Sequence, residues 1–216
     1  FGHLAHRDVL GLPFGSRLTA GSSHSTCVAV PAEMERWTIL LPHRTQILYS
    51  STIAPVLSGL KLRPGSVVLE SGTGSGSLTH ALVRAVAPSG HVHTVEFNSA
   101  RAQEARAEFK AHGLEEYVTV IHNSASSPGA WEVDDASADA AFLDLPKPWE
   151  ALDNVTKALK QGGRLCSFSP CIEQAQRVCA ALSKSKAFIA IKTIEVLERY
   201  QHTQRIPQQS GAGEEG

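Results

Sequence analysis

The sequence predicts an α/β fold, in which a mostly parallel, doubly wound sheet is preceded by a small N-terminal β module. From residue 66 onward, apolar strand-like runs alternate with helix-like stretches, as in parallel strands joined by right-handed crossovers. An apolar run at 67–69 leads into glycines at Gly72, Gly74 and Gly76, a pattern typical of a turn between strand and helix. The 216 residues, 42% hydrophobic and 19% charged, are enough for one such core with an appendage.

The first 41 residues differ from the rest of the chain. Short apolar stretches at 26–30 and 37–41 alternate there with turn residues such as Gly11 and Pro13, which favours a small β module. We expect a catalytic domain over residues 42–207, beginning with a broken amphipathic helix at 45–60. The low-complexity run 208–216 is expected to be a disordered tail.

The predicted domain alternates strands with helices. Strands are expected at 66–70, 91–96, 118–122, 138–144, 164–168 and 188–196. Helices are expected at 77–87, 99–111, 149–159 and 173–183. Ligands of such sheets bind beyond the carboxyl ends of the strands, where the winding direction reverses. The residues that follow each strand are therefore the candidate site.

The composition limits the kinds of substrate and cellular compartment that we expect for this protein. The 20 basic and 21 acidic residues leave a net charge of -1, so a polyanionic substrate would need local basic patches or a partner. The four cysteines form no CxxC pair, which favours free thiols in the cytosol or nucleus. Without a membrane-length apolar stretch or a signal peptide, we expect a soluble protein with no membrane association. The start at Phe1 suggests a piece of a longer chain.

The glycine turn predicts a nucleotide-like cofactor. Glycines allow positive φ and a close approach of the backbone to a ligand, and the following helix directs its N-terminus inward. A dinucleotide fingerprint would require glycine where this chain has Ser77. The spacing therefore favours S-adenosyl-L-methionine, bound by Gly72, Gly74, Ser75, Gly76 and Ser77. An NAD-dependent oxidoreductase remains an alternative.

Two carboxylates end predicted strands. Glu96 ends the strand that follows the turn, where an acid can accept hydrogen bonds from ribose hydroxyls. Asp144 ends an apolar strand, where desolvating a carboxylate is costly unless a ligand or partner compensates. We therefore expect Asp144 to carry the chemistry. His91 and His93 share one face of a strand, but without a third ligand nearby they predict no metal site.

A polar cluster at residues 41–49 leads into the amphipathic helix at the start of the domain. Thr45 would serve as a helix N-cap in a purely structural interpretation. A cap alone does not require His43, Arg44, Gln46 and Tyr49 together, so a functional role is favoured over a cap alone.

These motifs together resemble the catalytic subunits of the eukaryotic tRNA (adenine-58-N1)-methyltransferase. The resemblance rests on LPHRTQILYS at 41–50, ESGTGSGS at 70–77, HTVEF at 93–97, FLD at 142–144, PWEA at 148–151 and CSFSPCIEQ at 166–174. It covers most of the chain, from about Gly2 to Val196. It implies a Rossmann-like class I methyltransferase domain behind a barrel-like N-terminal module, methylating N1 of adenine 58 in tRNA. It also implies a nuclear heterotetramer with a non-catalytic homologous methyltransferase subunit.

The resemblance also implies roles for individual residues. Asp144 corresponds to the catalytic residue. The implied cofactor contacts are Leu48, the turn at 71–78, Glu96, Arg101, Ser124, Ala125 and Asp144. The implied substrate contacts are Gln46, Ile47, Leu48, Tyr49, Ser50, Ser71, Thr73, Leu78, Ser167 and Phe168.

The chain departs from the family pattern at two places. Ser124 stands where family members usually place an acid, so the hydrogen bond to the cofactor's adenine amine would be weaker or supplied by Asn123. The family's last strand, antiparallel and inserted in the sheet, has no counterpart after Pro207. A non-catalytic, RNA-binding methyltransferase-like subunit is the remaining alternative, although the intact turn and both carboxylates argue against it.

Overall fold

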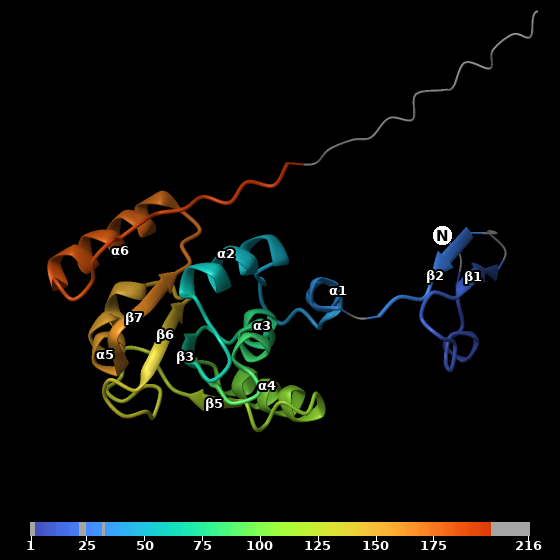
Figure 1. Ribbon diagram of the computed structural model, residues 1–216, viewed down its shortest axis with the longest axis horizontal. Coiled ribbons are helices and arrows are strands. Elements are labelled where there is room, and N and C mark those ends of the chain that lie inside the picture. The colour runs from blue at the N-terminus through green and yellow to red at the C-terminus, as the bar shows by residue number, and fades with distance from the viewer. Residues whose placement is uncertain (1–2, 22–24, 32, 200–216) are drawn as a thin grey trace, which may run out of the picture.

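The computed structural model describes residues 3–21, 25–31 and 33–199. Its centre is a five-stranded sheet (Figure 1), in which every neighbouring pair is parallel. The strands are β3 (Val67–Ser71), β4 (His91–Glu96), β5 (Val118–His122), β6 (Ala138–Leu143) and β7 (Leu159–Ser167). Their order is β5-β4-β3-β6-β7. The winding direction therefore reverses between β3 and β6, and a ligand site is expected at the carboxyl ends of these two strands.

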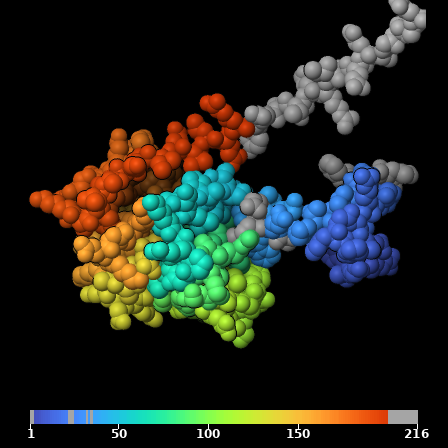
Figure 2. Space-filling view, in the orientation of Figure 1, coloured from blue at the N-terminus to red at the C-terminus, as the bar shows by residue number. Residues whose placement is uncertain are grey.

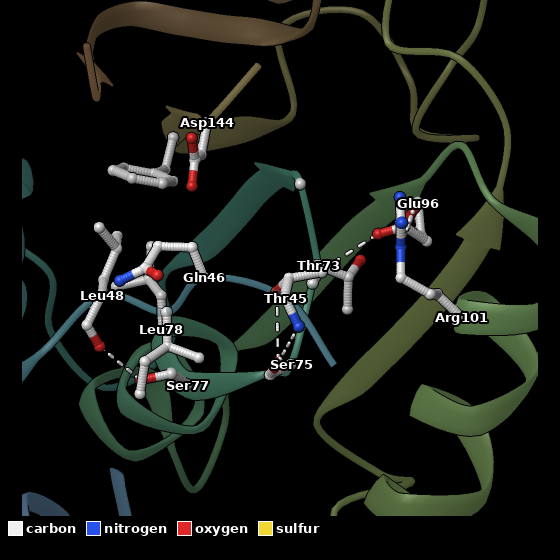
Figure 3. A pocket seen from close by; sticks show the side chains of 14 residues that line it. Thr45, Gln46, Leu48, Thr73, Ser75, Ser77, Leu78, Glu96, Arg101 and Asp144 are labelled. Carbon is white, nitrogen blue, oxygen red and sulfur yellow. Dashed lines mark hydrogen bonds and ion pairs between the residues drawn. The ribbon is translucent and has the colours of Figure 1, made fainter. Parts of the chain in front are cut away.

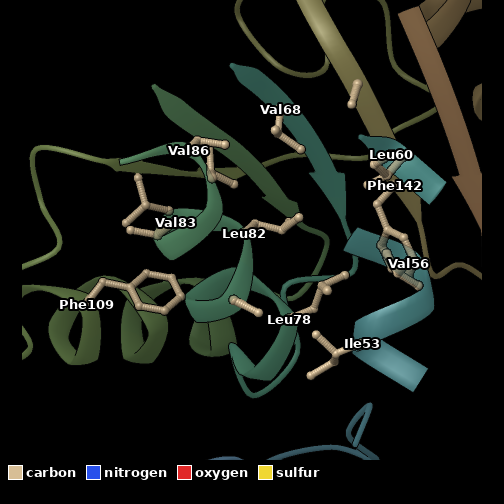
Figure 4. Packing of buried hydrophobic residues seen from close by; sticks show 14 of the residues in the cluster. Ile53, Val56, Leu60, Val68, Leu78, Leu82, Val83, Val86, Phe109 and Phe142 are labelled. Carbon is tan, nitrogen blue, oxygen red and sulfur yellow. The ribbon is translucent and has the colours of Figure 1, made fainter. Parts of the chain in front are cut away.

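Helices cover both faces of the sheet. One face carries α2 (Ser50–Leu60), α3 (Ser77–Val86) and α4 (Ser99–Ala111), and the other carries α5 (Leu152–Ala158) and α6 (Ile172–Ser185). Side chains alternate along a strand, so Val68 packs on the first face while Leu69 packs on the second. Phe109 and Phe142 fill the first core (Figure 4). These two apolar layers hold the carboxyl ends of the strands rigidly in place.

The N-terminal segment forms a separate small unit. Strands β1 (Arg17–Ala20) and β2 (Ser25–Val28) pair antiparallel, which confirms the small β module. The apolar stretch at 37–41 was expected to be strand-like, and this was wrong, because it belongs to helix α1 (Met34–Leu40) and its C-cap. Thr38 and Leu41 are both buried, three residues apart, which is the spacing of one helix face.

The strands at 91–96 and 118–122 and the helix at 99–111 match their predicted bounds. The predicted strand at 188–196 is wrong, since the structure assigns no strand to residues 186–199. A strand requires a hydrogen-bonding neighbour, and none of the described strands pairs with this segment. The segment instead runs back along the outside of α6 (Figure 2), where Thr193 Oγ1 lies 3.6 Å from Cys179 Sγ. Within the described part of the chain, no helix has the length and apolar character to cross a membrane.

Candidate active site

A cleft of about 170 Å³ opens where the winding direction of the sheet reverses (Figure 3). One wall is the segment 45–48, and the floor is the glycine turn, by which we mean residues 71–77. Glu96 and Arg101 lie at one end and Asp144 lies at the other, and Phe142 is also part of the lining. The structure thus gathers four separate stretches of sequence at the carboxyl ends of β3, β4 and β6.

The glycine turn presents bare backbone to the cleft. Gly72 and Gly74 have φ of +95° and +53°, and residues with a Cβ rarely adopt such positive values. A Cβ on Gly72 would collide with the backbone oxygen of Asp144, and one on Gly74 would lie 2.7 Å from Thr45 Oγ1. Gly76 caps α3 without a side-chain hydrogen bond, so the first-turn N–H groups remain for a ligand. The turn therefore fits an anionic or polar group at close range.

Glu96 is held in a fixed orientation at the end of β4. It is only 3% exposed. Its Oε1 accepts hydrogen bonds from Asn98 N at 2.9 Å and from Arg101 Nη2 at 2.7 Å. Its Oε2 accepts one longer bond, 3.2 Å from Gly74 N, and so keeps acceptor capacity toward the cleft. Such an oriented acceptor suits a vicinal diol.

Asp144 follows β6 on the other side of the glycine turn. Its backbone N–H donates to Ser71 O at 2.9 Å, which fixes the residue against the turn. Its side chain lies across the cleft from Gln46 (Figure 3). Burial raises the pKa of this carboxyl above its usual value, because a charged group is less stable away from water. A partly desolvated carboxylate is a strong hydrogen-bond acceptor for a ligand that carries an N–H group.

The segment 45–49 is not helical, although a helix was expected from residue 45. Ser75 Oγ accepts hydrogen bonds from Arg44 N at 2.9 Å and Thr45 N at 3.0 Å. Ser77 Oγ donates to Leu48 O at 2.7 Å. These bonds take up the backbone groups that a helix would use, so α2 begins only at Ser50. They also place Gln46 and Leu48 in the cleft wall.

The cleft brings together most of the predicted site residues. Those that line it are Gln46, Ile47, Leu48, Gly72, Thr73, Gly74, Ser75, Ser77, Leu78, Glu96, Arg101 and Asp144. Those outside its lining are Tyr49, Ser50, Ser71, Gly76, Ser124, Ala125, Ser167 and Phe168. The roles assigned to both groups stay predictions.

Some of the outlying residues still lie close to the cleft. Ser167 is in register with Leu143, and its buried hydroxyl has no hydrogen-bond partner among the residues that the structure describes. Phe168 donates its N–H to Leu143 O at 2.9 Å. Ser124 is on the loop after β5, and its Oγ lies 2.8 Å from Ser126 Oγ. The Ser124 hydroxyl is thus already engaged within its own loop.

Sequence reasoning overlooked two residues beside the cleft. Glu70 precedes the turn with 1% of its surface exposed, and burial raises its pKa to about 7. Thr79 Oγ1 donates a hydrogen bond to Glu70 Oε2 at 2.7 Å. Phe97 follows Glu96 and is 76% exposed, which is unusual for a large apolar ring. Both residues could have been found from their positions in the sequence. Glu70 lies just before the glycines, and Phe97 directly follows Glu96, the acid predicted to bind the ribose.

Comparisons with known proteins agree with this geometry. The family described as the tRNA methyltransferase complex GCD14 subunit matches residues 27–212. The chain is 44% identical over 201 residues to a protein of Dictyostelium discoideum named tRNA (adenine(58)-N(1))-methyltransferase catalytic subunit, covering 92% of this chain and 64% of the relative. A relative of the same name from Candida albicans is 38% identical over 201 residues, covering 91% and 59%. The chain spans less than two thirds of the length of these relatives.

Two solved structures resemble the fold. A SAM-dependent O-methyltransferase from Thermotoga maritima aligns with a TM-score of 0.75 and 28% identity, over 85% of this chain and 67% of that one. A tRNA (m1A58) methyltransferase from Aquifex aeolicus aligns with a TM-score of 0.72 and 26% identity, over 84% and 69%. In both, the similarity extends over most of the part of the chain that the structure describes.

Proposed function

The chain belongs to the family of the GCD14 subunit of the tRNA methyltransferase complex, and from this premise we propose that it transfers the methyl group of S-adenosyl-L-methionine to N1 of adenine 58 in tRNA. Its fold is the Rossmann-like class I methyltransferase fold predicted from the sequence. One observation carries the proposal: a single cleft holds the glycine turn between two oriented carboxylates, Glu96 and Asp144. A purely RNA-binding scaffold does not require this arrangement.

The residues present fit the proposed cofactor. The bare backbone at Gly72 and Gly74, with the N-terminus of α3, suits the carboxylate of the methionine part. Oε2 of Glu96 would accept hydrogen bonds from the ribose hydroxyls. The exposed ring of Phe97, next in the chain, would stack on the adenine. When bound, S-adenosyl-L-methionine supplies an electrophilic methyl group on a sulfonium.

The chemistry requires alignment more than a strong base. N1 of adenine has an in-plane lone pair at neutral pH, so it can form the new bond to carbon while the carbon–sulfur bond breaks and a thioether leaves. Holding the two reactants in line is worth up to about 7–11 kcal/mol of the barrier. Asp144 would accept a hydrogen bond from the exocyclic amine, present N1 to the methyl group and stabilise the positive charge that develops on the ring.

Access to N1 requires that the base leave its pairing partner. N1 lies on the pairing edge, so adenine 58 must be extruded from the tRNA and enter the cleft unpaired. Leu48 and Phe142 provide apolar surface in the cleft for such a base. Gln46, across the cleft from Asp144, would offer amide groups to its polar edge.

We further propose that the protein works in the nucleus as a heterotetramer with a non-catalytic homologous subunit. The net charge of -1 supports this, because most of the affinity of proteins for nucleic acid comes from basic residues that contact phosphates. The family description as a subunit of a complex also supports a shared tRNA surface.

A methylation assay with labelled S-adenosyl-L-methionine tests the proposal. A tRNA transcript with adenine at position 58 is incubated with the chain, with and without the homologous subunit. A transcript with guanine at that position serves as control. We expect label in the first transcript alone, and a reverse-transcription stop at position 58. Methylation at any other atom, or a chain with its partner that neither binds the cofactor nor methylates, contradicts the proposed function.

A further inference from the structure

Arg44 contacts the glycine turn at two of its residues, Ser75 and Gly74. Its backbone N–H binds Ser75 Oγ at 2.9 Å, and its Nη2 lies 3.4 Å from Gly74 O. The same residue begins the cleft wall, because Thr45 and Gln46 follow it directly. Arg44 therefore contacts the two surfaces that enclose the predicted cofactor site.

The guanidinium of Arg44 is anchored on α4. Its Nη1 forms an ion pair with Glu108 Oε2, and its Nε lies 3.7 Å from Glu104 Oε2. The side chains of Arg44 and Glu108 are only 14% and 12% exposed. Salt screens such a partly buried pair much less than a surface pair. The helix thus holds Arg44, and Arg44 in turn holds the wall and the turn.

The residue Gly74 connects this anchor to Glu96, the carboxylate predicted to bind the ribose. Its N–H donates to Glu96 Oε2 at 3.2 Å, while its carbonyl faces Arg44. A change in the position of Arg44 would therefore move the Gly74 N–H group. This group donates a hydrogen bond to Glu96, which is predicted to bind the cofactor. Arg44 itself does not line the cleft.

The same region brings together three residues of types that bind metals, His80, Glu108 and His112, whose ligand atoms lie within 4.8 Å of one another. The hydrogen bonds favour a different interpretation. Glu108 already pairs with Arg44, and His80 Nε2 lies 3.0 Å from His112 Nδ1. A divalent cation there would be repelled by the adjacent guanidinium.

We propose that Arg44 is a positioning residue: by bridging α4, the segment 45–48 and the glycine turn, it sets the spacing of the cofactor cleft before the cofactor binds. This inference rests on the proposed function, since it concerns the same cleft. Misplacement of binding groups by about 1 Å can cost up to about a hundredfold. The affinity for the cofactor should therefore depend on a residue that does not touch it.

Calorimetric titration of the purified chain with S-adenosyl-L-methionine tests the inference. We expect Arg44→Gln to raise the Kd on the order of tenfold to a hundredfold. Arg44→Lys should lie between wild type and Arg44→Gln, because lysine keeps the charge but lacks the planar fork. In a double-mutant cycle, adding Glu108→Gln to Arg44→Gln should change the Kd little further. Arg84→Gln, on the exposed side of α3, is the matched control and should bind like wild type.

Thermal unfolding without cofactor separates positioning from simple stability. If Arg44→Gln or Arg44→Lys lowers the Tm but leaves the Kd of the folded protein unchanged, the positioning role is overturned. Should Arg44→Gln not fold, Arg44→Lys still decides, since a Kd equal to that of wild type overturns the inference and a raised Kd supports it. A wild-type chain that does not bind the cofactor overturns the proposed function, and the role of Arg44 with it.

Discussion

Asp144 donates its backbone N–H to the carbonyl oxygen of Ser71 at 2.9 Å, across the neighbouring strands β6 and β3. This one hydrogen bond joins the predicted catalytic residue to the first residue of the glycine turn. It also brings the Asp144 backbone oxygen so close to position 72 that only glycine fits there. The predicted catalytic residue and the turn predicted to bind the cofactor are thus joined directly by their backbones. A shift in either one displaces the other.

Asp144→Asn should separate chemistry from cofactor binding. The amide keeps the shape of the side chain but is a weaker acceptor and carries no charge. We expect the single-turnover rate of tRNA methylation to fall about 100- to 1000-fold, while the Kd for S-adenosyl-L-methionine stays within a few-fold of wild type. Rapid-quench assays and calorimetry measure the two quantities. A rate like that of wild type would exclude Asp144 as the catalytic residue.

The pH dependence of the rate should follow the Asp144 carboxyl. Burial raises its pKa above the usual value of 3.8, and the ionised form is the stronger acceptor and carries the negative charge that stabilises the methylated ring. The rate should therefore fall as the pH drops through this raised pKa, at a higher pH than for an exposed aspartate. The control is Asp144→Asn, whose residual rate should lack this acid limb. An identical limb in both proteins would assign the titration to another group.

Gly72→Ala tests the bare backbone of the turn. The new Cβ would meet the Asp144 backbone oxygen at a φ of +95°, so we expect cofactor binding to be lost. Gly15 has the same φ of +95° and open space around it. Gly15→Ala should therefore cost about 1–3 kcal/mol of backbone strain and leave cofactor binding unchanged. Calorimetry on both variants decides, and retained binding in Gly72→Ala would refute the close-approach argument.

Glu70 should make the fold less stable as the pH rises. Burial raises its pKa from 4.5 to about 7 in the folded chain. Between these values the folded state keeps a proton that the unfolded state has lost, so the unfolding free energy falls by up to about 3 kcal/mol. Glu70→Gln, which can still accept the Thr79 hydrogen bond, should remove this dependence. Urea unfolding of both proteins at several pH values measures the unfolding free energy. A difference in this free energy between the two proteins that stays constant with pH would contradict the prediction.

Ser124→Asp should supply the acid that the resemblance described above leads us to expect at this position. A carboxylate could accept a hydrogen bond from the adenine amine of the cofactor, worth about 1 kcal/mol. We expect the Kd for S-adenosyl-L-methionine to fall by about fivefold. Ser126→Asp adds the same charge two residues along the same loop, on an exposed position, and should change the Kd less. Equal effects would indicate a general charge effect instead.

The sequence predicted the sheet well where local and tertiary preferences agree. Helix α4 begins where predicted because Asn98 caps it with a bond to Arg101 N. The pattern failed where distant contacts decide the structure. The helical pattern at 45–49 gave way to hydrogen bonds with Ser75 and Ser77, about 30 residues away. The segment at 188–196 has strand-forming residues, but a strand also depends on a neighbour that its own sequence cannot reveal.

The same distinction applies to the site. Glu96 and Asp144 were predictable because each lies at the carboxyl end of a strand, and parallel strands bring these ends together. The role inferred for Arg44 could not be predicted from the sequence, since it depends on Glu108, 64 residues away in the chain. Glu70 could have been found, because it meets the criterion applied to Asp144: an acid at the end of a buried strand.

Gly74 has a carboxylate on its N–H and a guanidinium on its carbonyl oxygen, so each of the two peptide groups that flank its Cα is held by a charged side chain. Glycine peptides rotate easily, and a loop that is free to rotate must be ordered each time a ligand binds. Here a flip of the peptide before Gly74 would point the Thr73 carbonyl at Glu96, and a flip of the peptide after it would point the Ser75 N–H at Arg44, so each flip would replace an attractive contact by a repulsive one. The entropy of ordering this loop is therefore lost when the chain folds, and little remains to be lost on ligand binding.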